Sequence, residues 1–137
     1  MKRLFSTKTS DSAFSFATLI LRLGAGLLIL INFGLNKLMH FSTIAPRFAD
    51  PFHIGTTASL SMVIFAEFFC AVFIVLGLFT RLAAIPLIIA MAVAIFTAHG
   101  GHFFGKESLA ASMFLIAFIA ILFFGPGKIS LDRFIAG

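Results

Sequence analysis

Four long apolar segments separated by short polar stretches dominate the hydrophobic pattern of the chain. They run from Ser15 to Leu35, from Ser59 to Phe79, from Leu82 to Ala98 and from Ser108 to Phe124. Apolar runs of about 18 or more residues are typical of helices that cross a hydrocarbon core about 30 Å thick. The last two runs lie near the lower limit, so we expect those helices to stand nearly upright. The pattern therefore predicts an all-α protein, a four-helix transmembrane bundle.

Polar residues and helix-breaking residues mark the ends of these segments. The basic stretch 1–14 predicts a segment outside the membrane, followed by one membrane domain over residues 15–137. The first apolar run is too long for a signal peptide and lacks a small-residue cleavage site, so we expect it to be retained. Thr80 and Arg81 leave room only for a tight turn, which makes the second and third helices antiparallel neighbours. The tail 130–135 predicts a short amphipathic turn at the membrane surface.

Composition excludes a soluble domain. The chain is 61% hydrophobic and 11% charged, whereas soluble domains carry about 25% charged residues. The formal charge of +5 does not indicate nucleic-acid binding, because most of the basic residues lie between or beside the apolar runs. Six of them share a side with both termini and three lie on the other side, which predicts cytoplasmic termini in a bacterial inner membrane. The six are Lys2, Arg3, Lys8, Arg81, Lys128 and Arg133, and the three are Lys37, Arg47 and Lys106.

Two ionisable residues lie inside the apolar runs, where a charge is costly and usually has a partner. Arg22 lies in the first run, and its long side chain could either reach the head groups or pair within the bundle. Glu67 lies in the second run and is too short to reach the surface, so it needs a partner, a proton or a polar pocket. Glu67 is therefore either a structural brace or part of a functional site.

Further polar residues are expected to gather near Glu67 at the outer end of the bundle. Asn32, Asn36 and Lys37 end the first helix, His99 ends the third, and Glu107 begins the fourth. Such a pocket could exchange protons with a quinone head group or hold a small anion. The competing interpretation is a wet polar rim without a ligand.

Metal and haem sites are not expected. His99 and His102 are three residues apart, but Gly100 and Gly101 loosen the segment between them, and no CxxCH motif is present. Nucleotide-binding and hydrolase signatures are also missing, which argues against a self-contained enzyme of those classes.

The motifs from Leu19 to Phe134 resemble those of DoxX-family membrane proteins. The similarity lies in the order of an arginine, a Gly-x-x-Lys motif and a glutamate, followed by Gly-x-x-Thr-Arg, a His–Gly–Glu connection and Gly-Pro-Gly-x-x-Ser-x-Asp. In this chain the charged and polar positions of the motifs are Arg22, Lys37, Glu67, Arg81, His99, Glu107 and Asp132. The resemblance implies a subunit linked to a quinone oxidoreductase. We expect Arg22 and Arg81 to have structural or charge-pairing roles.

Two functional hypotheses remain open. The first is a quinone-linked oxidoreductase subunit or membrane anchor, with no tightly bound cofactor of its own and with electrons supplied by a redox partner protein. The second is a non-enzymatic assembly factor, a scaffold or a small-molecule carrier. Membrane lipid surrounds the protein in either case, and a homo-oligomer is compatible with both.

Overall fold

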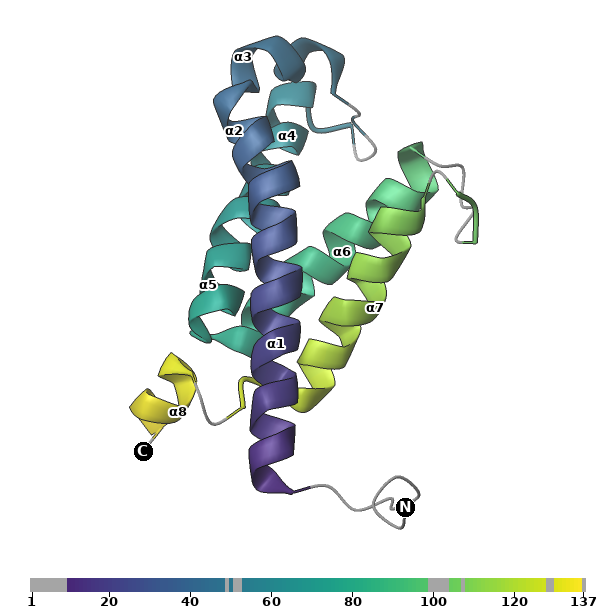
Figure 1. Ribbon diagram of the computed structural model, residues 1–137. Coiled ribbons are helices and arrows are strands. Elements are labelled where there is room, and N and C mark those ends of the chain that lie inside the picture. The colour runs from purple at the N-terminus through teal and green to yellow at the C-terminus, as the bar shows by residue number, and fades with distance from the viewer. Residues whose placement is uncertain are drawn as a thin grey trace.

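The computed structural model describes residues 10–48, 50, 53–98, 104–106, 108–127 and 130–136, most of which are helical (Figure 1). Four helical columns form the molecule. The first comprises α1 (Asp11–Ile29), η2 (Leu30–Gly34) and α2 (Leu35–Met39), and the second comprises α4 (Thr56–Ile64), η4 (Phe65–Cys70) and α5 (Ala71–Leu76). The third is α6 (Thr80–Ala98) and the fourth is α7 (Leu109–Phe124). Short helices α3 (Phe41–Ile44) and η3 (Ala45–Arg47) follow the first column, and α8 (Leu131–Ala136) follows the fourth.

The columns are long and apolar enough for a membrane protein. Asp11–Met39, Thr56–Leu76 and Thr80–Thr97 each qualify as a membrane span, with mean hydropathies of 2.1, 2.4 and 2.0. The shorter apolar α7 has 16 residues, or about 24 Å at 1.5 Å per residue. Large apolar side chains such as Ile20, Phe96 and Phe123 face outward, as suits a lipid surrounding. The predicted all-α four-helix membrane bundle is confirmed.

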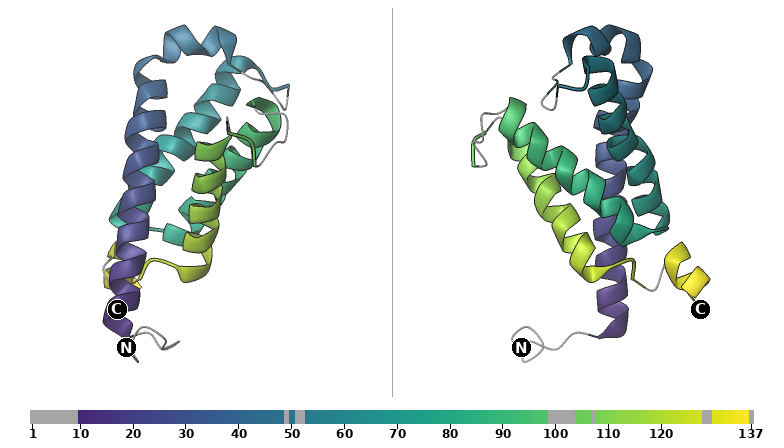
Figure 2. Two further views of the ribbon diagram at one scale, coloured as in Figure 1. Left: turned by 45° about the vertical axis from the view of Figure 1, so that its right-hand side comes forward. Right: turned by 180° about the vertical axis from the view of Figure 1, so that it is seen from behind.

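The columns form a ring that is tighter at one end than at the other. Column one packs against α5 and α7, while α6 packs against α7 and η4. We call the end with α8 the terminal end and the end with α3 the distal end. The paired α6 and α7 meet the other two columns near the terminal end and tilt away from them toward the distal end (Figures 1 and 2). Ile29, Ile74, Leu87, Phe118 and Ile121 are among the buried residues that form the core.

The turn between the second and third columns differs from the prediction. It lies at residues 77–79, whereas Thr80 and Arg81 belong to the first turn of α6. Gly77 ends α5 in the left-handed conformation, with φ of +73°, as is common just after a helix. The Asp132 carboxylate then accepts hydrogen bonds from the backbone N–H groups of residues 79 and 80, at 2.7 and 2.8 Å. Because this cap comes from a distant part of the chain, the local sequence alone predicts the turn a few residues too far toward the C-terminus.

Arg22 holds the same end of the bundle together from inside. Its guanidinium donates to the carbonyl oxygens of Ile74 at 3.1 Å, of Val75 at 3.4 Å and of Pro126. The residue is only 2% exposed, so the side chain does not reach out to the head groups. A cation at the C-terminal carbonyls of α5 is favoured by the helix dipole. Of the two interpretations of Arg22, the structure shows pairing within the bundle.

The C-terminal helix α8 is fixed to this turn through Asp132. The backbone N–H of Asp132 donates to the carbonyl of Gly77 at 2.8 Å. Although desolvation acts to raise it, hydrogen bonds from residues 79 and 80 and the charge of Arg22 hold the pKa of Asp132 below its ordinary value. Phe134 and Ile135 of the same helix are exposed. The predicted helical turn in the tail is thus present, with apolar side chains on its outside.

Candidate functional site

An ion pair links the first and second columns in the distal half of the bundle. Lys37 Nζ of α2 donates to both carboxylate oxygens of Glu67 in η4, at 3.1 and 2.9 Å. The Glu67 side chain is 4% exposed and that of Lys37 is 20% exposed. The ammonium also lies 5.3 Å from the centroid of the Phe33 ring, within range of a cation–π contact. The acidic group in the apolar run therefore has its partner on another helix.

Two π-helical turns lie side by side behind this pair. η2 and η4 contact each other, and Gly34 of η2 lies directly against the backbone of Glu67 and Phe68. Single π turns widen a helix by one residue and are frequent at functional sites. Lys37 is three residues beyond Gly34, so it lies on nearly the same side of the column. The close backbone contact at Gly34 therefore sets the spacing from Lys37 to Glu67.

We expect Gly34→Ala to destabilise the protein by about 2 kcal/mol, because inserting a methyl group into a packed contact forces the backbone to shift. The added Cβ would lie 2.6 Å from the carbonyl carbon of Glu67. Gly24→Ala is the matched control, because a Cβ there meets no atom within 4 Å and alanine favours the helix. Thermal unfolding of the two purified variants measures the difference, and equal melting temperatures would contradict the assigned contact.

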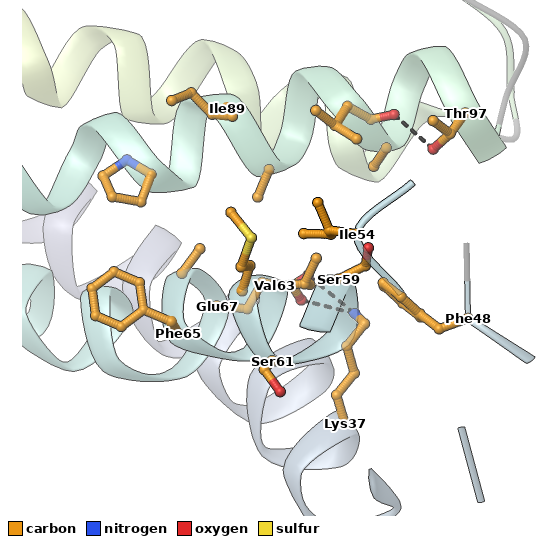
Figure 3. A pocket seen from close by; sticks show the side chains of 16 residues that line it. Lys37, Phe48, Ile54, Ser59, Ser61, Val63, Phe65, Glu67, Ile89 and Thr97 are labelled. Atoms are coloured by element: carbon orange, nitrogen blue, oxygen red, sulfur yellow. Dashed lines mark hydrogen bonds and ion pairs between the residues drawn. The ribbon is translucent and has the colours of Figure 1, made fainter. Parts of the chain in front are cut away.

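A cavity of about 650 Å³ adjoins the ion pair, between the second column and α6 (Figure 3). Lys37 and Glu67 line it from one side, together with Ser59 and Ser61 of α4, and the hydroxyl-bearing Thr97 lines it from α6 on the opposite side (Figure 3). The Thr97 hydroxyl donates to the Val93 carbonyl at 2.7 Å. The rest of the lining is apolar: Phe48, Ile54, Met62, Val63, Phe65, Ala66, Pro86, Ile89, Ala90, Val93 and Ala94. The cavity thus combines one charged pair with a largely hydrocarbon wall.

Asp50 organises the loop at the distal rim of this cavity. Its carboxylate accepts hydrogen bonds from the N–H groups of Ile54 at 3.0 Å and Gly55 at 2.9 Å, and from the Ser59 hydroxyl at 2.9 Å. Although desolvation acts to raise it, these bonds and the charge of His53 hold the pKa of Asp50 below its ordinary value. Since Ile54 and Ser59 line the cavity, Asp50 fixes part of its wall.

The other residues predicted for the pocket have different surroundings. Asn32 and Asn36 are exposed and do not line the cavity, and Asn32 Nδ2 instead donates to the carbonyl of Leu28 one turn earlier at 2.9 Å. His99 and Glu107 lie outside the described residues.

Arg81, which was predicted for a structural or charge-pairing role, is exposed. Its Nη2 lies 3.5 Å from the carbonyl oxygen of Phe123, at the end of α7.

Sequence reasoning missed the α6 wall of the cavity and the serines of α4. No charged residue marks that part of α6, and its alanines look like ordinary helix packing positions. Ser59 and Ser61 offered a weak signal, because they are polar residues near the start of an apolar run. Within the part of the chain that the structure describes, no three His, Cys, Asp or Glu side chains gather in a way that could hold a metal ion.

Comparison with known proteins gives the family. The model of the DoxX family matches residues 17–100, more than half of the chain. The chain belongs to the DoxX family. The matched range includes both partners of the ion pair and every residue that lines the cavity of about 650 Å³. No curated protein and no solved structure matches this DoxX protein.

The site of this DoxX protein is chemically suited to a ligand that is mostly apolar and carries a hydrogen-bonding head. Lys37 supplies N–H donors, and the Glu67 carboxylate supplies acceptors. Pockets of several hundred cubic ångströms with a few polar groups are typical small-molecule sites.

Proposed function

We propose that this DoxX protein is the quinone-binding membrane subunit of an oxidoreductase, and that a partner protein carrying a redox cofactor supplies its electrons. The observation that supports this function is the Lys37–Glu67 pair, which borders a largely apolar cavity of about 650 Å³. A quinone ring is flat and apolar and has two carbonyl oxygens. It therefore needs an apolar wall for the ring and a hydrogen-bond donor for a carbonyl oxygen, and this cavity has both.

The two charged residues have distinct roles in this proposal. The Lys37 ammonium donates a hydrogen bond to a quinone carbonyl oxygen, and the Glu67 carboxylate is a proton-exchanging group within reach of the ring. Reduction of the quinone to the quinol takes up two electrons from the partner's cofactor and two protons. Ser59 lies on the cavity wall and is bonded to Asp50 at the rim, which places polar groups between the site and the distal surface.

The proposal also includes a membrane location and an orientation for the protein. A bacterial inner membrane with both termini in the cytoplasm fits the bias of the basic residues, six of which the sequence pattern assigns to the side of both termini and three to the other side. The ion pair and the cavity then lie in the outer half of the bilayer. Quinones dissolve in this membrane, so they would reach the cavity sideways from the lipid.

Titration of the purified protein with a tailless benzoquinone tests the proposal, with tight binding expected for the wild type. Lys37→Met is expected to weaken binding about tenfold or more, because a hydrogen bond from a charged donor is lost. Lys106→Met is the matched control, since Lys106 is exposed and does not line the cavity, and its affinity should equal that of the wild type.

Two results would contradict the proposal. One is that the folded wild-type protein does not bind the quinone, and the other is that Lys37→Met binds it as tightly as the wild type. Purification with native partners adds an independent test, because the proposal requires a partner that carries a redox cofactor. A stable partner without one would favour the scaffold hypothesis instead.

A further inference from the structure

A second cavity, of about 320 Å³, lies between the second column and α6 on the terminal side of the first. Phe65 and Pro86 line both cavities, so the two spaces adjoin at these residues. On α6 the smaller cavity is lined from Leu82 to Pro86 and the larger one from Pro86 to Thr97. The two together follow α6 for about 22 Å, at 1.5 Å per residue.

Polar groups are divided unequally between the two cavities. The charged pair and all the hydroxyl groups line the larger cavity, whereas the smaller one is lined by apolar side chains and the sulfur of Cys70. Three phenylalanines contribute to the smaller wall, and the rings of Phe73 and Phe79 contact each other edge to face, with centroids 6.3 Å apart. Because the polar groups line only the larger cavity, an amphipathic molecule that spans both fits with its polar part there and its apolar part in the smaller cavity.

We infer that the smaller cavity holds the isoprenoid tail of a quinone whose ring lies beside Lys37 and Glu67. This inference rests on the proposed function and narrows its substrate class to long-tailed lipid quinones. The ring lies in the wide cavity, and the tail passes between Phe65 and Pro86 and then along Ile85 and Leu82 toward the terminal end. A space of about 320 Å³ suits one chain better than two, which favours a single-tailed quinone over a two-chained phospholipid.

Binding of two quinones with the same ring, one without a tail and one with a two-isoprene tail, tests this inference. Ile85→Trp adds bulk at an exposed position that lines only the smaller cavity. It is expected to weaken binding of the tailed quinone about tenfold, because the blocked tail loses its packing contacts, and to leave the tailless quinone within about twofold of wild type. Comparing each ligand between variant and wild type removes the effect of its partitioning into detergent.

Ile116→Trp on α7 is the matched control, because Ile116 is exposed and lines neither cavity, and both quinones should bind to it as to the wild type. Leu82→Trp is a second blocking variant in case Ile85→Trp fails to fold, and the same selective loss is expected from it.

The outcomes separate this inference from the proposed function. If the wild type binds neither quinone, the proposed function fails. If the wild type binds both quinones and the blocking variants change neither affinity, or change both equally, the tail site is overturned while the quinone site stands. Native mass spectrometry adds a last outcome. A phospholipid held by the wild type and lost from Ile85→Trp, with quinone binding unchanged, would assign the cavity to lipid and overturn the inference.

Discussion

Replacing Lys37 by methionine is expected to destabilise the folded DoxX bundle by about 3–5 kcal/mol, because it leaves a buried carboxylate without its cation. Glu67 is 4% exposed on its side chain and has both oxygens within 3.1 Å of Lys37 Nζ. The cavity beside it is lined mostly by apolar side chains, and the Glu67 backbone packs against Gly34 of the neighbouring π turn. Glu67→Met is expected to cost a similar amount, since it leaves the ammonium unpaired.

The double variant Lys37→Met/Glu67→Met should be more stable than either single variant. Two methionines fill a similar volume without charge, and replacing a whole buried ion pair by apolar residues is often neutral or stabilising. Unfolding of the wild type, both single variants and the double variant in mixed micelles with increasing denaturing detergent measures the coupling energy. We expect this energy to be about 3 kcal/mol, as for groups in direct contact.

The double variant also separates folding from binding. If the double variant folds as stably as the wild type but no longer binds a tailless quinone, the charges of Lys37 and Glu67 are needed for ligand binding and not for folding. Single-variant losses that simply add in the double variant would show that the two residues act independently. That result would contradict the ion pair as the central feature of this site.

The four columns could be predicted from sequence because length and hydrophobicity determine membrane helices directly. The partnership of Glu67 with a group on another helix was expected for the same reason, since an isolated carboxylate is too costly in an apolar segment. The position of Lys37 at the end of the first run made it one candidate among several. Sequence alone did not single it out from Asn32, Asn36, His99 and Glu107.

Other features depend on contacts between distant parts of the chain. The two π turns are not visible in the hydrophobic pattern, and they pack together where Gly34 lies against the backbone of Glu67. The α5–α6 turn was placed too late because its cap comes from Asp132, more than fifty residues further along the chain. The cavity itself follows from the tilt of α6 and α7, which packing between whole helices determines (Figure 2).

The terminal end of the bundle depends on Arg22, and Arg22→Met is expected to cost at least about 3 kcal/mol. The guanidinium donates hydrogen bonds to the carbonyl oxygens of Ile74, Val75 and Pro126. Methionine has no donor and cannot replace any of these bonds. In a lipid surrounding these carbonyl groups would have no water to replace the lost bonds. Arg47→Met is the matched control, and a change within about 0.5 kcal/mol is expected there because Arg47 is exposed.

Arg22→Lys distinguishes the charge of this residue from its geometry. Lysine keeps the positive charge near the C-terminus of α5 and near Asp132. However, one ammonium cannot reproduce the forked guanidinium, whose N–H groups bond carbonyl oxygens both at the end of α5 and at Pro126. We therefore expect about half of the loss seen in Arg22→Met, measured by the same detergent unfolding. If Arg22→Lys were as stable as the wild type, charge alone would hold the terminal end together. A loss equal to that of Arg22→Met would instead assign the whole effect to the guanidinium hydrogen bonds, which tie the first column to the end of α5 and to the segment after α7.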